Sequence, residues 1–280
     1  MKEDISQEKK SKIIFDLHHA ERPLMLPNIW DPLGALLLED LGFPVVATSS
    51  SAVALTNGLQ DGENMSFRSL LPQLEKIVEL VSVPVTADVE KGYATDDVEL
   101  EQNIIALIEA GIVGINFEDG DKMIKELVPV EIQCQRIKLI KKAAEQKGIP
   151  LFLNARTDTY IHSHLFSSAE EQLQETIKRG KAYCEAGAHC FFPILMKEEM
   201  QIKTVVEQVP LPVNIMAIPA IPSFHTLIEA GVKRISLGSS FLKTAMEAMR
   251  EQALSLKEFK GQERIEQNKI ATGYLESLIP

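Results

Sequence analysis

Short apolar runs recur along the chain, and each is followed by a longer segment whose apolar residues repeat every three or four positions. The first pattern is typical of buried strands and the second of amphipathic helices that cover a sheet. The runs begin about 30 residues apart, the length that one strand, one helix and two loops require. The predicted strands are 24–30, 45–50, 83–90, 114–119, 150–158, 190–195, 212–217 and 234–239.

The alternation of strands and helices predicts parallel βα units. Eight units without a Pro/Gly/Ser-rich linker favour one closed (β/α)₈ TIM-type barrel over two open doubly wound halves. We therefore expect a single domain over 1–280, with its barrel core at about 22–250, a leading helix over 12–21 and a C-terminal helical extension over 251–280. The predicted covering helices include 67–80, 96–109, 133–146, 169–185 and 224–229.

The charge balance narrows the classes of partner. The 280 residues contain 40 acidic and 29 basic side chains, a formal net charge of −11, which argues against nucleic-acid binding. No apolar run approaches the roughly 20 residues that span a bilayer, and the first residues are charged. Three scattered cysteines do not make a disulfide framework. These features predict a soluble, cytoplasmic protein that binds no membrane.

Acidic side chains gather at the ends of predicted strands, where barrel enzymes place their chemistry. Asp88 and Glu90 end the third strand and share one face, Glu118 ends the fourth, and Asp61 lies in the loop after the second. Carboxylates that converge repel each other unless a cation or protons neutralise them. A hard cation with oxygen ligands, most simply Mg²⁺, resolves this conflict. The alternative is that these residues are helix caps and surface charges.

The fifth strand ends with Arg156, whose planar guanidinium can form a fork for a substrate carboxylate. It can equally pair with Asp158 or Glu118, and the sequence leaves both open. The hydroxyl-rich segment 48–52 after the second strand offers backbone amides and side chains to a second anionic group. Together these residues predict a site for a small carboxylate.

The ordered set of strand-end motifs resembles the isocitrate lyase/phosphoenolpyruvate mutase superfamily over about residues 12–250. Each motif is weak alone, whereas the set in this order is specific. The matching segments are 50–52 (SSA), 88–93 (DVEKGY), 116–119 (NFED) and 154–158 (NARTD), with further likeness at 28–31 (NIWD), 214–216 (NIM) and 231–236 (GVKRIS).

The resemblance implies a helix-swapped barrel that assembles as a homodimer or homotetramer. It also implies a lyase that uses Mg²⁺ or Mn²⁺ to cleave a C–C bond in a small 2-oxo or 2-hydroxy carboxylic acid, through a metal-stabilised enolate. By position, Asp88 would bind the metal directly, and Asp61, Glu90 and Glu118 would hold its waters. The expected substrate-binding residues are Trp30, Ser50, Ser51, Ala52, Arg156 and Asn214.

The chain departs from the characterised lyases in the loop after the fourth strand. The segment 120–127 lacks their lysine-cysteine-glycine-histidine signature, and the sixth strand ends without their glutamate or the mutase's histidine. Cys134 lies on the next predicted helix, so we expect a structural thiol. We expect 120–128 to be a mobile lid, with Lys122 as the candidate acid/base and Tyr93 or a metal-bound water next; a solvated surface lysine is the alternative.

Other functions remain open at this point. A phosphonomutase or other C–P bond enzyme of the same superfamily is one, and the chain is most similar to its phosphonomutase-like branch. A barrel that keeps its metal and carboxylate pocket without turnover is another. A Schiff-base aldolase is disfavoured because none of the strand cores contains the lysine that this chemistry requires.

Overall fold

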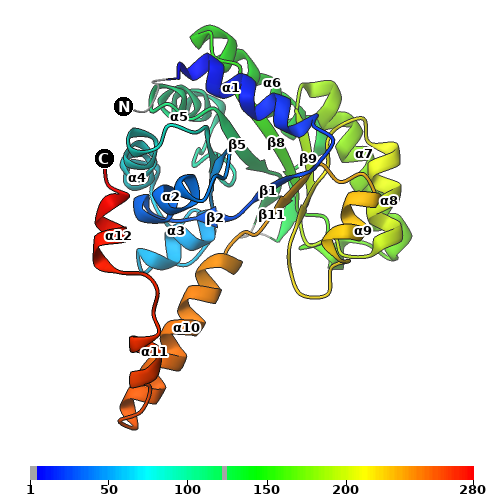
Figure 1. The fold of residues 1–280 in the computed structure, drawn as a ribbon. Helices are drawn as coiled ribbons and strands as arrows, with labels where there is room; N and C mark the ends of the chain where they lie inside the picture. Colours follow the sequence, from blue (N-terminus) through cyan, green and yellow to red (C-terminus); the bar gives the residue numbers. More distant parts are fainter. Residues whose placement is uncertain (1–4, 122–124) are drawn as a thin grey trace.

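The computed structural model describes residues 5–121 and 125–280. In these residues, parallel strands at eight positions close into a barrel (Figure 1), as the sequence predicts. The first position is split at Pro27, so that one half pairs with the last strand and the other half with the next strand. A bridge between Phe191 and Val213 joins the remaining edge. The barrel strands are β1 (Leu24–Leu26), β2 (Asn28–Ile29), β3 (Val46–Thr48), β4 (Val85–Asp88), β5 (Gly114–Glu118), β8 (Phe152–Thr157), β9 (Cys190–Pro193), β10 (Asn214–Met216) and β11 (Arg234–Ser236).

Helices cover the outer face of the barrel (Figure 1). Side-chain oxygens at Ser66, Asp96 and Ser168 accept bonds from the first turns of three of them, which explains why these helices begin where they do. The helices are α1 (Gln7–His18), α2 (Pro32–Asp40), α3 (Ser50–Thr56), α4 (Phe67–Leu80), α5 (Asp97–Glu109), α6 (Val130–Lys147), α7 (Ala169–Ala186), α8 (Glu199–Gln208), α9 (Phe224–Glu229), α10 (Ser240–Lys257), α11 (Gln262–Glu266) and α12 (Thr272–Ser277), with a 3₁₀ turn η1 (Ser163–Leu165).

Several boundaries differ from the sequence prediction, and at two of them a side-chain cap explains the difference. Helix α1 begins at Gln7, since the Ser6 side chain accepts a bond from Lys9 N, and it ends at His18. The second strand ends at Thr48, and Ser49 caps α3 by accepting from Ala52 N. The hydroxyl-rich segment is therefore the first turn of a helix rather than an open turn.

The barrel has two apolar cores. The larger lies between the sheet and the surrounding helices. The smaller fills the N-terminal part of the barrel interior and is closed by α1, which crosses the N-terminal end of the strands (Figure 1). Ser11 Oγ donates to Pro150 O there, and Ile14 packs against Leu24 and Phe152. The opposite, C-terminal end of the barrel is left for the polar residues.

Two segments extend beyond the barrel. The short strands β6 (Gly120–Asp121) and β7 (Glu126–Leu127) pair as an antiparallel hairpin in the segment 120–128, which the sequence predicts to be a mobile lid. Helix α10 projects away from the barrel, and the chain then returns so that Tyr274 of α12 donates to Asp40 of α2 at 2.8 Å (Figure 1).

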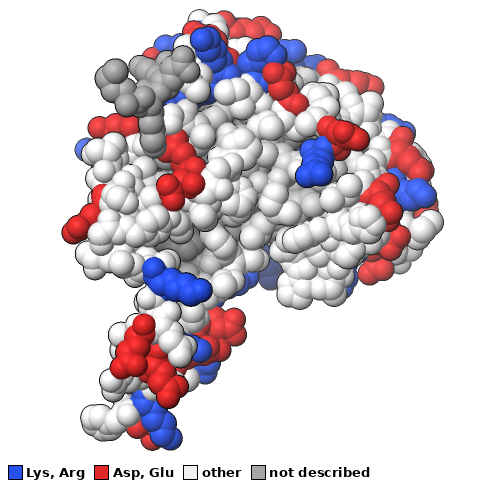
Figure 2. Space-filling view, in the orientation of Figure 1, with Lys and Arg blue, Asp and Glu red and all other residues white. Residues whose placement is uncertain are grey.

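Charged side chains in Figure 2 lie mainly toward the outline of the described surface and on the projecting extension, with acidic and basic groups interspersed. The middle of this face is largely uncharged. Among the described helices, none is long and apolar enough to cross a membrane.

Candidate active site

A polar cavity of about 180 Å³ lies at the C-terminal end of the barrel strands. Its walls combine hydroxyls, amides, two carboxylates and one guanidinium with a few apolar side chains, which is the composition of a small-molecule site. The cavity suits a ligand of only a few heavy atoms. It is lined by Asn28, Ser49, Ser50, Ser51, Asp61, Asp88, Asn116, Arg156, Ile161, Phe192, Ile194, Met216, Ser236, Gly238 and Ser239.

Asp88, at the end of β4, accepts hydrogen bonds from described residues through only one of its two carboxylate oxygens. Its Oδ2 accepts from the backbone N of Ser50 at 3.0 Å and from the Ser50 hydroxyl at 2.7 Å, and its own N donates to Thr48 Oγ1 at 3.1 Å. Its Oδ1 is buried and has no hydrogen-bond partner in the described residues. A buried, unmatched carboxylate oxygen is costly, and a cation satisfies it. Asp88 with Asp61 on the same cavity wall therefore fits a hard divalent metal.

Glu90 does not line this cavity. Its backbone is in the left-handed region, with φ 47°, and its side chain is buried. Its Oε1 accepts from Glu63 N at 2.9 Å and from the Tyr93 hydroxyl at 3.2 Å. Glu63 in turn accepts from the backbone N of Tyr93 at 2.8 Å. Glu90 thus ties the loop that carries Asp61 to the end of β4.

Tyr93 is directed at Glu90 rather than into the cavity. Burial, together with the neighbouring Glu90 and Asp88, raises the pKa of Tyr93 above its ordinary value. The phenol is therefore a protonated hydrogen-bond donor. This placement does not support the role of general acid or base on a ligand in the cavity.

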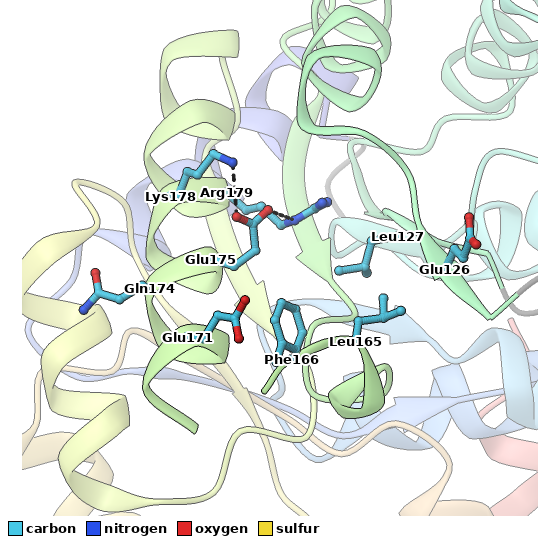
Figure 3. A pocket seen from close by; sticks show the side chains of 9 residues that line it. All are labelled: Glu126, Leu127, Leu165, Phe166, Glu171, Gln174, Glu175, Lys178 and Arg179. Atoms are coloured by element: carbon cyan, nitrogen blue, oxygen red, sulfur yellow. Dashed lines mark hydrogen bonds and ion pairs between the residues drawn. The ribbon is translucent and has the colours of Figure 1, made fainter. Parts of the chain in front are cut away.

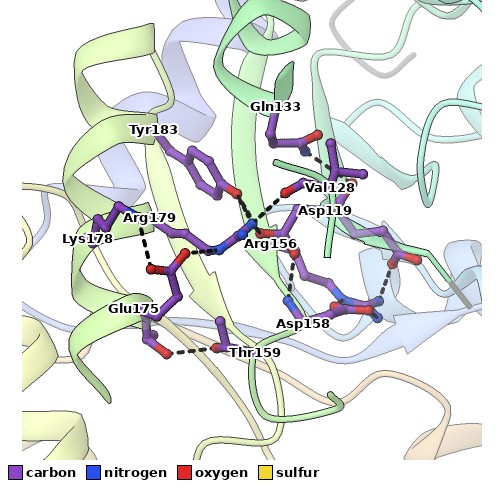
Figure 4. Close-up of polar contacts among 12 residues, drawn as sticks. Asp119, Val128, Gln133, Arg156, Asp158, Thr159, Glu175, Lys178, Arg179 and Tyr183 are labelled. Atoms are coloured by element: carbon purple, nitrogen blue, oxygen red, sulfur yellow. Dashed lines mark hydrogen bonds and ion pairs between the residues drawn. The ribbon is translucent and has the colours of Figure 1, made fainter. Parts of the chain in front are cut away.

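Arg156 lies between two carboxylates (Figure 4). Its Nη1 is 2.6 Å from Glu118 Oε2, and its Nε and Nη2 donate to the two oxygens of Asp158 at 2.6 and 3.0 Å. Burial disfavours the charged form, but Asp158 and Glu118 outweigh it and raise the pKa of Arg156. Two of the five guanidinium N–H groups donate to Asp158, and Nη1 forms an ion pair with Glu118, so in the described residues the guanidinium keeps N–H groups for a ligand at the cavity wall.

Behind Arg156, Asp119 is the centre of a buried network (Figure 4). Its Oδ1 accepts from Asp158 N at 2.8 Å, and its Oδ2 accepts from Arg179 Nη1 at 2.8 Å and from the Tyr183 hydroxyl. Burial raises the pKa of Asp119, although the Arg179 guanidinium opposes the shift. Arg179 Nη1 also donates to Val128 O at 2.9 Å. The network therefore fixes the base of the β6–β7 hairpin against the strand that carries Arg156.

A wider groove of about 670 Å³ lies on the far side of this network, between α7 and the hairpin (Figure 3). Its floor is formed by Leu127, Leu165 and Phe166. Its basic groups are already paired, since Glu175 contacts both Arg179 at 2.9 Å and Lys178 at 3.1 Å. The groove contains none of the predicted site residues, so the smaller cavity remains the candidate active site.

The predicted metal ligands are not assembled as a set. Within residues 5–121 and 125–280, no three His, Cys, Asp or Glu side chains form a metal-binding group. Asp88 and Asp61 share the cavity, whereas Glu90 is turned to Tyr93 and Glu118 to Arg156. The sequence leaves the Arg156–Glu118 pair open as an alternative, but it does not indicate that Glu90 accepts from Tyr93 and from Glu63 N.

Only some of the predicted substrate-binding residues line the cavity. Ser50, Ser51 and Arg156 line the cavity. Trp30 does not, because the chain turns after β2 into α2 and the indole lies in a separate groove between α2, α10 and α12. The remaining two are inside the protein: the Ala52 N bonds to Ser49, and Asn214 accepts from Ser236 Oγ at 3.1 Å. Lys122, the predicted acid/base, lies outside the described residues.

Several cavity residues had no predicted role. Asn28 accepts from the backbone N of Leu237 and Gly238, both at 2.9 Å, and so joins the first strand to the loop after β11. Gly238 has φ 53°, and a Cβ there would lie 2.7 Å from Met216 Sδ. Asn116 and Asp158 belong to the quoted motifs, and alternation along the strands would have placed Asn116 on the inner face. Cys134 lies in α6 with its Sγ 3.5 Å from Ala182 O, away from the cavity lining.

Comparisons with known proteins agree with this geometry. A family model for phosphoenolpyruvate phosphomutase matches residues 14–257. An uncharacterised protein of Mycobacterium tuberculosis is 31% identical over 225 residues, covering 80% of this chain and 81% of its own. The 2-methylisocitrate lyase of Bacillus subtilis is 28% identical over 214 residues, covering 74% of this chain and 67% of its own.

Solved structures show the same fold. A Burkholderia cenocepacia protein provisionally described as a phosphonomutase is 34% identical, with a TM-score of 0.84 over 89% of this chain and 98% of its own. Phosphonopyruvate hydrolase in complex with oxalate and Mg²⁺ is 22% identical, with a TM-score of 0.82 over 96% of this chain and 94% of its own. The chain therefore belongs to the phosphoenolpyruvate phosphomutase family, within the isocitrate lyase/phosphoenolpyruvate mutase superfamily.

Proposed function

We propose that the protein is a Mg²⁺-dependent lyase that cleaves a C–C bond in a small 2-oxo or 2-hydroxy carboxylic acid. The observation that carries this proposal is the pairing, in one cavity, of Asp88, whose buried Oδ1 has no partner in the described residues, with Arg156, whose guanidinium keeps N–H groups that donate to no described residue. The first suits a cation and the second a carboxylate. The relation to 2-methylisocitrate lyase and to a hydrolase solved with oxalate and Mg²⁺ supports the same class of ligand.

Asp88 would hold the metal directly and Asp61 would hold it through water, with Mn²⁺ as an alternative cation. When bound, the metal would supply Lewis-acid stabilisation of negative charge on a substrate oxygen. Glu118 and Glu90 act differently in this proposal: Glu118 orients the Arg156 guanidinium, and Glu90 holds the Asp61 loop in place. The chain therefore prepares the site through hydrogen bonds that exist before any ligand binds.

The rest of the cavity positions and shields the substrate. Arg156 would donate its remaining N–H groups to the substrate carboxylate, and Ser51 and Ser239 offer hydroxyls to the same cavity. Ile161, Phe192, Ile194 and Met216 form an apolar side that limits water around a reactive anion. In the described residues, no lysine, histidine or cysteine lines the cavity. Lys122 on the expected lid remains our candidate for the proton-transfer step.

The phosphonomutase-like relative at 34% identity favours a second candidate, cleavage or rearrangement of a C–P bond in a phosphonate of the same size. Both reactions place a carboxylate and an adjacent oxygen in the cavity. They differ in the bond that is broken, so a substrate screen separates them.

The test is a turnover screen of purified protein over 2-oxo acids, 2-hydroxy acids and phosphonopyruvate, with Mg²⁺ or with EDTA. We expect C–C cleavage of at least one acid that disappears with EDTA and in Asp88→Ala. The exposed Asp97→Asn variant on α5 serves as the matched control and should retain wild-type turnover. Cleavage that persists in EDTA and in Asp88→Ala would refute metal dependence. No turnover of any compound, with no stabilisation by oxalate and Mg²⁺, would refute the lyase.

A further inference from the structure

The middle of the barrel interior is unusually polar for this fold. TIM-type barrels are usually filled by layers of bulky aliphatic side chains. Here Thr86, Asn116, Asn154, Asn214 and Arg234 are all buried on barrel strands. Strand register places Asn116 beside both Asp88 and Asn154, and Asn214 beside Arg234. This layer lies directly below the cavity, and Asn116 also belongs to the cavity wall.

The Asn116 side chain is held in one orientation by two donors. Its Oδ1 accepts from Asn154 Nδ2 at 2.6 Å and from Arg234 Nη2 at 3.2 Å. A carbonyl oxygen accepts hydrogen bonds and an amide nitrogen donates them, so the two donors determine which end of the amide faces the interior. A flipped amide would place N–H groups against the Asn154 amide and the Arg234 guanidinium. Both donors are fully buried and have little room to move.

The burial of Arg234 lowers the stability of the folded protein, which suggests that the residue has a role other than stabilisation. Arg234 is completely buried, and in the described residues its guanidinium makes one hydrogen bond, the one to Asn116. Its Nε and Nη1 have no partner there. Burying a cation with so few partners is unfavourable, and an apolar residue would pack here at lower cost. The bond that this cation does make is the one that orients Asn116.

The other end of the Asn116 amide faces the cavity. Nδ2 donates no hydrogen bond to any described residue, and it is not among the buried atoms that lack a partner. It therefore presents neutral N–H groups to the ligand space, next to Asp88 in the strand register. A neutral, rigid donor beside a carboxylate recognises an acceptor oxygen and rejects a group that lacks one.

We propose that Asn116 is a specificity-determining residue, whose Nδ2 donates to an oxygen of the bound 2-oxo or 2-hydroxy acid, and that Arg234 and Asn154 are positioning residues that act through it. This inference rests on the proposed function. It assigns the oxygen of the ligand that faces the barrel interior to Asn116 on β5. A ligand with a methyl group at that position binds more weakly.

The test measures oxalate binding by calorimetry in saturating Mg²⁺. We expect Asn116→Ala to bind oxalate roughly tenfold more weakly than wild type. The reason is that the charged ligand loses one hydrogen bond. Wild-type affinity in a folded Asn116→Ala variant would overturn the inference and leave the proposed function standing. An absence of oxalate binding by the wild-type protein would overturn both.

Asn116→Ala removes the partner of a buried arginine and could unfold the protein. A second comparison therefore uses an apolar background, since replacing both members of a buried pair is better tolerated than replacing one. In the Arg234→Met variant, Asn154 still donates to the Asn116 oxygen. This variant is the reference, and the double variant Asn116→Leu/Arg234→Met is compared with it. The double variant should bind oxalate roughly tenfold more weakly than this reference. Equal affinities would overturn the inference.

Discussion

Arg156 contacts two carboxylates before any ligand arrives, and this decides what the cavity can accept. With Asp88 and Asp61 nearby, the formal charge around the cavity is negative even after Arg156 is counted. A second carboxylate from a substrate would be repelled from such a site unless a cation accompanied it. Under the proposed function, the residue-level charges therefore favour joint binding of metal and substrate over binding of the substrate alone.

Arg156→Lys should weaken oxalate binding in Mg²⁺ by roughly ten- to a hundredfold, although the positive charge is kept. An ammonium cannot hold Glu118 and both oxygens of Asp158 and also donate N–H groups to a ligand. The lost interaction corresponds to about 1.5–3 kcal/mol, typical of a hydrogen bond to a charged group.

Calorimetry of wild type, Arg156→Lys and the exposed Arg250→Lys variant on α10 measures this effect. Arg250→Lys should match wild type, because its side chain lies outside the cavity lining. An Arg156→Lys protein with unchanged affinity would show that the guanidinium only holds Glu118 and Asp158 and does not meet the ligand.

At the residue scale, the sequence predicts which side chains reach the barrel mouth better than it predicts their partners. Asp88 and Arg156 follow from position, because strand ends meet at one edge of the barrel, whereas Asp61 lies in the loop between α3 and α4. The orientations of Glu90 and Glu118 do not follow, because Tyr93, Glu63 and Arg156 compete for them in three dimensions.

At the scale of elements, the barrel strands were predictable because each is a short apolar run between polar loops. The β6–β7 hairpin was not, since its strands are two residues each and carry no period. Helix α1 shows how an element outside the repeat completes the fold. Its His18 is fully buried, stacks on Phe152 with ring centroids 4.1 Å apart, and bonds to Ile14 O through Nδ1.

His18 makes the packing of α1 against the N-terminal end of the barrel less stable in acid. Burial, with a smaller contribution from Arg234, lowers the pKa of His18 to about 3. Below the ordinary histidine pKa near 6.5, His18 is protonated in the unfolded chain but stays neutral in the folded protein. The free energy of unfolding therefore falls as pH falls. At pH 4.5 this one group should cost about 2–3 kcal/mol relative to pH 7.

Urea unfolding at pH 7 and pH 4.5 tests the assignment. His18→Gln should lose less stability between the two values than wild type, whereas the exposed His225→Gln should not differ from wild type. Some acid sensitivity should remain, because burial also lowers the pKa of His189 to about 4. If His18→Gln and wild type lose equal stability, His18 is not the buried neutral group described here.

At the scale of the whole molecule, the C-terminal extension has little to pack against. Of the 18 residues of α10, only Leu242 is buried, and Met246 and Met249 are 53% and 64% exposed. A helix of this length usually gains its stability from an apolar face packed against other elements. Beside its base is an apolar groove of about 390 Å³ lined by Trp30, Leu33 and Phe241 among others.

We propose that a second copy of the chain covers this helix and groove, giving a homodimer or a homotetramer. In a two-fold assembly each α10 can pack on the groove of its partner, so that both unpartnered surfaces are buried at once. A helix-swapped barrel, which the sequence resemblance implies, is one form of this arrangement. The Trp30 indole would then contribute to subunit contact rather than to the substrate cavity.

Analytical ultracentrifugation of the full chain should give a mass of at least twice 31.1 kDa. Met246→Glu/Met249→Glu should shift it toward the monomer, because each carboxylate would have to be desolvated in the interface. Glu247→Gln, an exposed change on the same helix, is the matched control and should leave the mass unchanged. A wild-type monomer at micromolar concentration would refute the assembly, and an oligomer that survives both glutamates would place its interface on another face of the barrel.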